Sequence, residues 1–506
     1  MQQNRKRLGV ACILVILVSS FAIRYNPIPI TWELAEIKRF HLQPPDSTVS
    51  VAYANEEYYN ALPEHIIYKT YPVYIQELAP VNYLDSLRQL EPEIAFDLTK
   101  IKTQEDWIKA GELVFNWPVA SYRKIEGKVP HLSSTAFQNN HGKYSKKGIY
   151  PANHYIIAEK GKIQLGSLSC ASCHTRVMDN GEIIAGAQGN VFSLSGFAND
   201  IESGKIPYQA ILQENQKLTF VPWIEQHTKN LTVSKEEFVK YLRNLPLGVS
   251  DRSGMAFLYP LTIPSLIGLK DIEYLDHTGL MRHDNPGDLM RYAAFNQGMD
   301  MLTAYNGYIP MGIENNSKLP DHTSWRHPFG YVPKRYSDAQ LYALTQYIYS
   351  LQPPVNPNKF AKALLKEGSV IFHKAGCVTC HTPPLYTNNM LTPVNGFEPP
   401  DAHLKMYNIF NVSVETDSVT ALYSRRATGY YKVPSLRGVW YRSAFFHNGH
   451  LTKLEEVFDP KRLKSDYVPS GYLPPQVKSL AVKGHPFGLD LTEKEKEALI
   501  AYLKSL

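Results

Sequence analysis

The sequence is poor in cysteine, in net charge and in long apolar runs. Only five of its 506 residues are cysteine, basic side chains exceed acidic ones by just six, and no run of five or six basic residues occurs. Nucleic-acid binding therefore has no support, because it requires a concentrated basic surface. With 44% apolar residues, the composition also excludes a disordered, collagen-like or coiled-coil chain.

One apolar run does occur, at the N-terminus. Three basic residues at 5–7 precede an apolar stretch of 16 residues at 8–23, which is shorter than the roughly 20 residues of a membrane-spanning helix. Such a pattern is typical of a secretory signal, and residues 20–22 offer a small-x-small cleavage site. An uncleaved membrane anchor within 1–24 is the alternative. We therefore expect an exported protein in the periplasm, either soluble or tethered to the inner membrane by this segment.

One cysteine, Cys12, lies in this apolar run. The other four form two pairs with identical spacing, and each pair is followed by a histidine. The two segments are Cys170-Ala-Ser-Cys173-His174 and Cys377-Val-Thr-Cys380-His381. C-x-x-C-H is the attachment sequence of c-type haem: the two thiols add to the vinyl groups of one porphyrin, and the histidine is placed to bind the iron. A redox C-x-x-C or half of a zinc site are the alternatives, but neither explains a histidine after both pairs. The sequence predicts two covalently bound haem c groups, with His174 and His381 as iron ligands.

A duplication runs along the chain, because four short segments recur in the same order. The pairs are Gly111–Phe115 with Gly368–Phe372, the two C-x-x-C-H segments, Pro264-Ser-Leu266 with Pro434-Ser-Leu436, and Ala343–Leu351 with Ala498–Leu506. The copies lie 257 residues apart at the first pair, 207 at the haem segments and 155 at the last. The first copy is therefore longer, and its largest insertion, of 50 residues, precedes its haem segment.

The repeated segments indicate helices. Ser337-x-x-Gln340 and Thr492-x-x-Glu495 are capping boxes at matching starts of the last helix of each copy. A further helix is predicted over 362–372, before the second haem segment, with Gly376 near its end. These segments predict a mainly α protein with two tandem cytochrome c-type domains, long loops and an N-terminal extension.

The predicted boundaries follow from the repeats and from a proline-rich stretch between them, which cannot be helical throughout. They are 1–24 for the signal or anchor, 25–104 for the extension, 105–352 for the first cytochrome c domain, 353–359 for the linker and 360–506 for the second domain.

The candidate for the distal ligand of the iron, on the side away from the C-x-x-C-H histidine, differs between the two copies. Methionine is a common distal ligand in cytochromes c, yet no methionine follows Met406. The segment before the final helix contains His485 in Gly-His-Pro-Phe-Gly, and the first copy has His327 in Arg-His-Pro-Phe-Gly. We expect His485 to bind the second iron. His327 is the candidate ligand at the first iron. The alternatives there are one of several methionines, or an open position. The competing methionines are Met281, Met290, Met299, Met301 and Met311.

Three other interpretations accompany these ligands. His-Pro-Phe-Gly could be only a turn motif, with proline and glycine supplying the backbone geometry. His277 and His447, which match each other in the repeat, are expected to be structural groups beside the haem edge. Trp223 and Trp440 are the candidates for a bridge between the two haems.

The second copy resembles bacterial di-haem cytochrome c peroxidases at Val433–Val439, Phe445–Gly449 and Leu454–Val457. The late His485 is more similar to the di-haem rubber-oxygenase branch of that superfamily, and Lys461 stands where the peroxidases place a methionine. The resemblance covers about 105–506. It implies an exported oxidoreductase with two cytochrome c domains facing each other.

The resemblance also implies a division of labour. The haem at His381 and His485 would be closed and would pass electrons, and the haem at His174 would bind peroxide or dioxygen. The catalytic acid or base is unassigned. The expected electron donor is a small redox protein or a quinol-linked cytochrome. The alternatives are a plain electron carrier with both irons saturated and an oxygenase acting on an apolar organic substrate.

Overall fold

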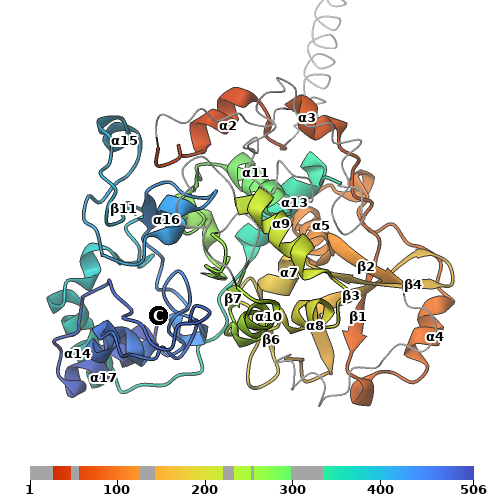
Figure 1. The fold of residues 1–506 in the computed structure, drawn as a ribbon. Helices are drawn as coiled ribbons and strands as arrows, with labels where there is room; N and C mark the ends of the chain where they lie inside the picture. Colours follow the sequence, from red (N-terminus) through yellow and green to blue (C-terminus); the bar gives the residue numbers. More distant parts are fainter. Residues whose placement is uncertain (1–26, 47–55, 125–142, 220–232, 252–255, 298–333) are drawn as a thin grey trace, which may run out of the picture. The chain divides into compact units, whose positions relative to one another are not determined.

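The two copies of the repeat each contain one pair of packed helices in the computed structural model, which describes residues 27–46, 56–124, 143–219, 233–251, 256–297 and 334–506. In the first copy α5 (Gln104–Asn116) packs against α13 (Asp338–Ser350). In the second copy α14 (Lys362–Lys374) packs against α17 (Glu493–Leu503). Figure 1 shows both pairs.

A glycine allows close approach of the helices at the same point of both pairs. A Cβ on Gly111 would lie 2.0 Å from the carbonyl oxygen of Ala343, and one on Gly368 would lie 2.1 Å from that of Ala498. Aromatic rings pack beside the crossings, with centres 5.1 Å apart in the first copy and 5.5 Å apart in the second. The ring pairs are Phe115 with Tyr347 and Phe372 with Tyr502. The duplication inferred from the sequence is therefore present as a repeated helix crossing.

The predicted helix starts are confirmed. The Ser337 hydroxyl accepts from the backbone N–H of Gln340, and the Thr492 hydroxyl accepts from that of Glu495. Each completed capping box satisfies N–H groups that the first helical turn leaves without partners. The helix predicted over 362–372 is α14, and Gly376 follows it with a φ of +76°.

A four-stranded antiparallel sheet occupies the region of the 50-residue insertion. Its order is β1-β3-β4-β2, with β1 at Thr70–Tyr74, β2 at Ala120–Lys124, β3 at Ile149–Glu159 and β4 at Lys162–Ser167. Thr70 of the N-terminal extension pairs with Ile156 of the insertion. The expectation of a mainly α protein is confirmed only in part, since the protein is helix-rich but also contains small sheets.

The remaining elements are short. The helices are α2 (Leu34–Phe40), α3 (Glu56–Ala61), α4 (Tyr83–Arg88), α7 (Cys170–Cys173), α8 (Ser195–Glu202), α9 (Tyr208–Thr219), α10 (Lys235–Asn244), α11 (Pro286–Gln297), α15 (Asp401–Met406) and α16 (Val419–Tyr423). The two-stranded sheets pair β5 (Thr175–Val177) with β6 (Ile183–Ala185), β7 (Val249–Ser250) with β8 (Leu261–Thr262), β9 (Tyr274–Leu275) with β10 (Met281–Arg282), and β11 (Leu391–Pro393) with β12 (Tyr430–Lys432).

Single turns of 3₁₀ helix connect several of these elements. They are η1 (Gln76–Leu78), η2 (Leu98–Lys100), η4 (Leu269–Asp271), η5 (Cys377–Thr379), η6 (Val439–Tyr441), η7 (Leu454–Phe458) and η8 (Pro460–Leu463). The turns η4 and η6 follow the two Pro-Ser-Leu segments, and each begins after a glycine with positive φ, Gly268 or Gly438. The repeat therefore extends to these turns.

Buried polar contacts join the two copies. Asp276 and Arg426 form an ion pair whose side chains are 3% and 4% exposed. Removing either partner would leave an uncompensated buried charge, so the pair ties these segments together. Beside it, the Thr278 hydroxyl donates to the Arg426 carbonyl and the Thr428 hydroxyl donates to the Thr278 carbonyl, both at 2.6 Å.

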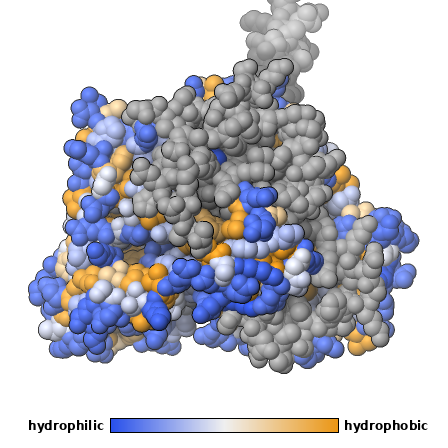
Figure 2. All heavy atoms as spheres, in the orientation of Figure 1, coloured by the Kyte–Doolittle hydropathy of each residue, from blue (hydrophilic) through white to orange (hydrophobic). Residues whose placement is uncertain are grey.

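The predicted boundaries at 105–352, 353–359 and 360–506 stay predictions, because residues 31–506 form one compact unit. The predicted signal or anchor at 1–24 lies outside the described residues. Within the described part of the chain, no helix is both long enough and apolar enough for a bilayer. The face drawn in Figure 2 mixes hydrophilic and apolar side chains.

Candidate haem centres

The first C-x-x-C-H segment begins as a short helix, α7, that is anchored to the sheet. The Ser169 hydroxyl accepts from the N–H of Ser172 at 3.1 Å and caps the helix. The Ser172 hydroxyl donates to the carbonyl of Ala152 on β3 at 2.6 Å. The serine between the two cysteines therefore fixes the helix against the inserted strand.

His174 follows this helix, and its orientation is set by a carbonyl of the repeated Pro-Ser-Leu segment. Its Nδ1 lies 3.0 Å from the carbonyl oxygen of Pro264. Because a carbonyl can only accept, Nδ1 is the donor in this contact, which leaves Nε2 as the nitrogen that could face a metal. A metal-binding histidine is usually oriented in this way through its other ring nitrogen.

The second C-x-x-C-H segment repeats this arrangement. Gly376 ends α14, and η5 then presents Cys377, followed by Cys380 and His381. The Nδ1 of His381 lies 3.2 Å from the carbonyl oxygen of Tyr386. Burial lowers the pKa of His381 to about 4, against the opposing effect of hydrogen bonds to the carbonyls of Tyr386 and Pro434. His381 is therefore neutral at pH 7, as a metal ligand must be.

The cysteines of the second pair, Cys377 and Cys380, do not have the properties of reactive redox thiols. Cys377 and Cys380 are free thiols. Burial raises the pKa of Cys377 to about 11 and also raises that of Cys380, whereas a reactive C-x-x-C depends on a lowered thiol pKa. In the described residues, no group of three or more His, Cys, Asp or Glu side chains is arranged to hold a metal ion. The redox-pair and zinc-site alternatives therefore gain no support there.

His485 lies opposite His381, although the two are 104 residues apart in sequence. Their ring centres are 6.4 Å apart and their planes are inclined by 49°. A histidine nitrogen binds a metal at about 2 Å, which places the ring centre about 3 Å from that metal. Two histidines on opposite sides of one metal therefore have centres about 6 Å apart, close to the separation observed.

The backbone around His485 is held rigidly. Its N–H donates to the carbonyl of Val414 at 2.7 Å, and its carbonyl accepts from Arg462 at 2.8 Å. Gly484 and His485 both have positive φ, and a Cβ on Gly484 would lie 2.4 Å from the backbone nitrogen of Thr416. Glycine is therefore required at 484, and the Gly-His-Pro-Phe-Gly segment is both a turn and the support of this histidine.

The electrostatics of His485 favour a neutral imidazole. Burial lowers its pKa to about 3, with further lowering by His381 and Arg462. Its Nδ1 is buried and has no hydrogen-bond partner. A neutral, buried imidazole facing a second one has the donor set of a closed haem iron.

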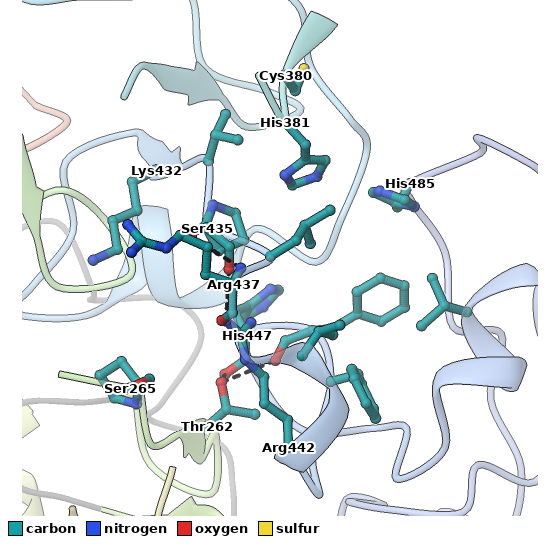
Figure 3. Close-up of a pocket in the computed structure, with 18 of the residues that line it drawn as sticks. Thr262, Ser265, Cys380, His381, Lys432, Ser435, Arg437, Arg442, His447 and His485 are labelled. Atoms are coloured by element: carbon teal, nitrogen blue, oxygen red, sulfur yellow. Dashed lines mark hydrogen bonds between the residues drawn. The ribbon is translucent and has the colours of Figure 1, made fainter. Parts of the chain in front are cut away.

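The two histidines line a cavity of about 300 Å³. Cys377 and Cys380 line it as well, together with apolar side chains such as Phe372, Leu436 and Val457. Figure 3 shows His381 and His485 reaching the cavity from two separate segments. Both thiols, both imidazoles and an apolar wall therefore surround the same space, which fits a covalently attached porphyrin.

His277 and His447 also line this cavity. The Nε2 of His277 lies 2.7 Å from the carbonyl oxygen of Thr262, and burial lowers the pKa of His277 to about 4. His447 stacks on Tyr431 with ring centres 4.3 Å apart, and its Nε2 is 3.7 Å from a carboxylate oxygen of Asp417. Both imidazoles are thus held by neighbouring protein groups.

Most of the candidates for the distal ligand of the first site lie outside the described residues. His327 lies outside them, as do Met299, Met301, Met311 and Trp223. Met281 is buried in β10, and the sulfur of Met290 is 4.0 Å from the hydroxyl of Thr31. Trp440 packs edge-on against Tyr441 with ring centres 5.0 Å apart, and nothing in this contact assigns it a bridging role.

Sequence reasoning missed two groups of this site. The carbonyl of Pro264 faces the Nδ1 of His174, and the carbonyl of Pro434 forms a hydrogen bond with His381. The repeated Pro-Ser-Leu segment was the signal that could have indicated them. The cavity wall also carries Lys432, Arg437 and Arg442, which no sequence motif marks.

No protein-family model matches the sequence, and no curated protein matches it. Among solved structures, the chain is similar to a MauG-like protein associated with microbial copper homeostasis, at 17% identity over 60% of this chain and 91% of that one, with a TM-score of 0.29. It is also similar to the di-haem peroxidase BthA from Burkholderia thailandensis, at 15% identity over 82% and 90% of the chains, with a TM-score of 0.26. Hydrazine synthase from Kuenenia stuttgartiensis matches at 16% identity over 60% and 88%, with a TM-score of 0.28.

The resemblance to di-haem peroxidases that the sequence indicated is thus matched by structural similarity, at low identity, to a di-haem peroxidase and a MauG-like protein. What the site can do chemically is therefore inferred from the residues of this chain alone.

Proposed function

We propose that the protein is an exported oxidoreductase with two covalently bound haem c groups, which reduces peroxide or activates oxygen at the first haem with electrons passed through the second. The observation that carries the proposal is the position of His485 across a cavity from His381, with their ring centres 6.4 Å apart. Cys377 and Cys380 line the same cavity. The two tandem cytochrome c-type domains are part of the same proposal.

In the proposed function, the second site, at His381 and His485, is the centre that transfers electrons. When bound, haem supplies one-electron chemistry at iron, tuned by its axial ligands and by burial. His381 would hold it from the proximal side, with Nδ1 donating to the protein, and His485 would hold it from the distal side. If His381 and His485 both hold the group, no position would be left for substrate, so this site would serve electron transfer.

At the first site, we propose that the metal stays available for substrate. Cys170 and Cys173 would attach the porphyrin, and His174, oriented by Pro264 at 3.0 Å, would hold its iron. His327 is proposed as a labile distal ligand there. The catalytic acid or base stays unassigned.

The second candidate function is a non-catalytic electron carrier. The repeated His-Pro-Phe-Gly favours it, because the segment demonstrably positions His485 and would position His327 in the same way. An oxygenase acting on an apolar organic substrate is the third candidate. For all three we propose a periplasmic location with or without an N-terminal anchor, and a small redox protein or quinol-linked cytochrome as electron donor.

Haem attachment is tested by removing one thiol pair at a time. After expression with the cytochrome c maturation machinery, intact mass and haem staining are expected to show two haems in the wild type. Replacing both Cys377 and Cys380 with alanine should remove one haem, because no thioether can then form at that site, and replacing Cys170 and Cys173 should remove the other. Cys12→Ala is the matched control and should keep two. A wild-type mass with fewer than two haems would contradict the proposal.

Enzyme and carrier are separated by electron paramagnetic resonance with and without cyanide, before and after partial reduction. We expect one low-spin signal from the bis-histidine site that cyanide does not change. The other haem should be high-spin, or should lose its ligand to cyanide, because its distal position is open or weakly capped. Two low-spin signals that cyanide leaves unchanged in both redox states would identify an electron carrier and remove the enzymatic proposal.

A further inference from the structure

The cavity wall at the second site carries three positive side chains and no negative one. Lys432, Arg437 and Arg442 line it, and its described lining residues include no Asp or Glu. Buried charges in proteins are normally paired. The wall is therefore built for an occupant that brings negative charge.

Arg442 is partly buried, and its guanidinium is held by backbone carbonyls. One of its terminal nitrogens donates to the carbonyl of Ser435 at 2.7 Å and to that of Arg437 at 3.0 Å. Its Nε is buried and has no hydrogen-bond partner. Burial lowers the pKa of Arg442, but a guanidinium keeps its charge in proteins. Its position is thus fixed by the backbone, while one N–H and the charge remain uncompensated.

Lys432 approaches the same cavity from β12. Its Nζ donates to the carbonyl of Tyr274 at 3.1 Å, which takes one of the three N–H donors of an ammonium. The negative charge of Asp276 attracts Lys432, but Asp276 is already paired with Arg426. The other N–H donors of Lys432 are therefore available to an acceptor in the cavity.

Arg437 differs from the other two. Its side chain is 42% exposed, and it lies 3.9 Å from the carboxylate of Asp271 at the rim. Exposed pairs of this kind contribute little and are screened by salt. Its charge is already shared, so it is the weakest of the three as a partner for a ligand.

We propose that Arg442 and Lys432 are the counter-charges for the two carboxylates of the haem attached at Cys377 and Cys380. The inference rests on the proposed function, since it names how this chain would hold the polar edge of a cofactor whose apolar body and iron are held elsewhere. Charge-assisted hydrogen bonds from guanidinium or ammonium to carboxylate are about twice as strong as neutral ones, and here they would form in a buried setting. Figure 3 shows Lys432 and Arg442 on the cavity wall away from Cys380.

The arrangement also connects this haem to the first copy of the repeat. Lys432 is bonded to Tyr274 of β9, which belongs to the first copy. A carboxylate bound by Lys432 would therefore be held by a side chain whose position depends on both copies. The redox properties of the second haem would then depend on the contact between the copies.

The test is the reduction potential of the bis-histidine haem, measured by spectroelectrochemical titration of the wild-type protein and of two variants with both haems attached. Arg442→Gln and Lys432→Met should each make the haem harder to reduce, because a nearby positive charge favours the more negative, reduced state. We expect about a tenfold change in the reduction equilibrium, which is about 59 mV for one electron. Lys432→Arg keeps the positive charge, so its reduction potential should stay close to that of the wild type.

The controls separate the inference from the function on which it rests. Arg437→Gln should shift the potential less than the other two, and the exposed Lys478→Gln, outside the cavity wall, should not shift it. If the wild type lacks haem at Cys377 and Cys380, the proposed function fails. If haem is attached but neither Arg442→Gln nor Lys432→Met shifts the potential beyond Lys478→Gln, this inference alone is overturned. Lys432→Met serves if Arg442→Gln does not fold, because Arg442 also holds the backbone of Ser435 and Arg437.

Discussion

His485→Ala is expected to convert the second haem from a closed, low-spin centre into one that binds cyanide. The imidazole of His485 is 6.4 Å from that of His381, measured between ring centres, and its pKa of about 3 keeps it neutral at pH 7. Removing it leaves one axial position of the iron empty, which changes both spin state and potential. The measurement is electron paramagnetic resonance of the oxidised variant with and without cyanide. Almost complete loss of the original low-spin signal is expected.

Three controls sharpen this result. His373→Ala changes an exposed histidine of the same copy that does not line the cavity, and it should leave the spectrum unchanged. His447→Ala changes a cavity-lining imidazole that is stacked on Tyr431, and it should leave the low-spin signal in place. Imidazole added to His485→Ala should enter the vacated position and restore that signal. A variant that keeps its low-spin, cyanide-insensitive spectrum with two haems attached would show that another residue binds the iron.

Local sequence patterns predicted those parts of the site that depend on local geometry. C-x-x-C-H brings two thiols and an imidazole together over five residues, and the capping boxes at Ser337 and Thr492 act within one helical turn. His485 was predicted as an iron ligand in a different way, from the absence of methionine after Met406 and from the repeated His-Pro-Phe-Gly. That pattern is informative because Gly484 must approach the backbone of Thr416 closely.

The features that the sequence did not predict depend on contacts between distant segments. β1 at Thr70–Tyr74 pairs with β3 at Ile149–Glu159, and no turn residue or spacing links them. Lys432 and Arg442 become a charged wall only when the second copy folds back on itself and meets Tyr274 of the first. A single lysine or arginine in a sequence is most often solvated, so nothing marked these two beforehand.

Gly111→Ala and Gly368→Ala are each expected to destabilise the protein strongly. The added Cβ would lie 2.0 Å from the carbonyl oxygen of Ala343 in one variant and 2.1 Å from that of Ala498 in the other. The obstacle is backbone, so a helix must move and a side-chain rotation cannot relieve the contact. Overpacking costs about 3 kcal/mol at the upper end of its usual range, and the better helix propensity of alanine returns about 1 kcal/mol. We expect a net loss of about 2 kcal/mol in the free energy of unfolding, measured by denaturant titration with far-ultraviolet circular dichroism.

Gly196→Ala is the matched control for this pair. Gly196 lies in α8, another helix of the chain, and a Cβ there would meet nothing within 4 Å. The same substitution should therefore leave stability unchanged or raise it by up to about 1 kcal/mol, through helix propensity alone. Opposite signs at Gly196 and at the two crossing glycines would show that steric contact between helices, and not the loss of glycine as such, causes the effect. Because Gly111 and Gly368 occupy equivalent positions of the repeat, equal losses are expected from both. A stable Gly111→Ala beside an unstable Gly368→Ala would mean that the two helix crossings are not equivalent in solution.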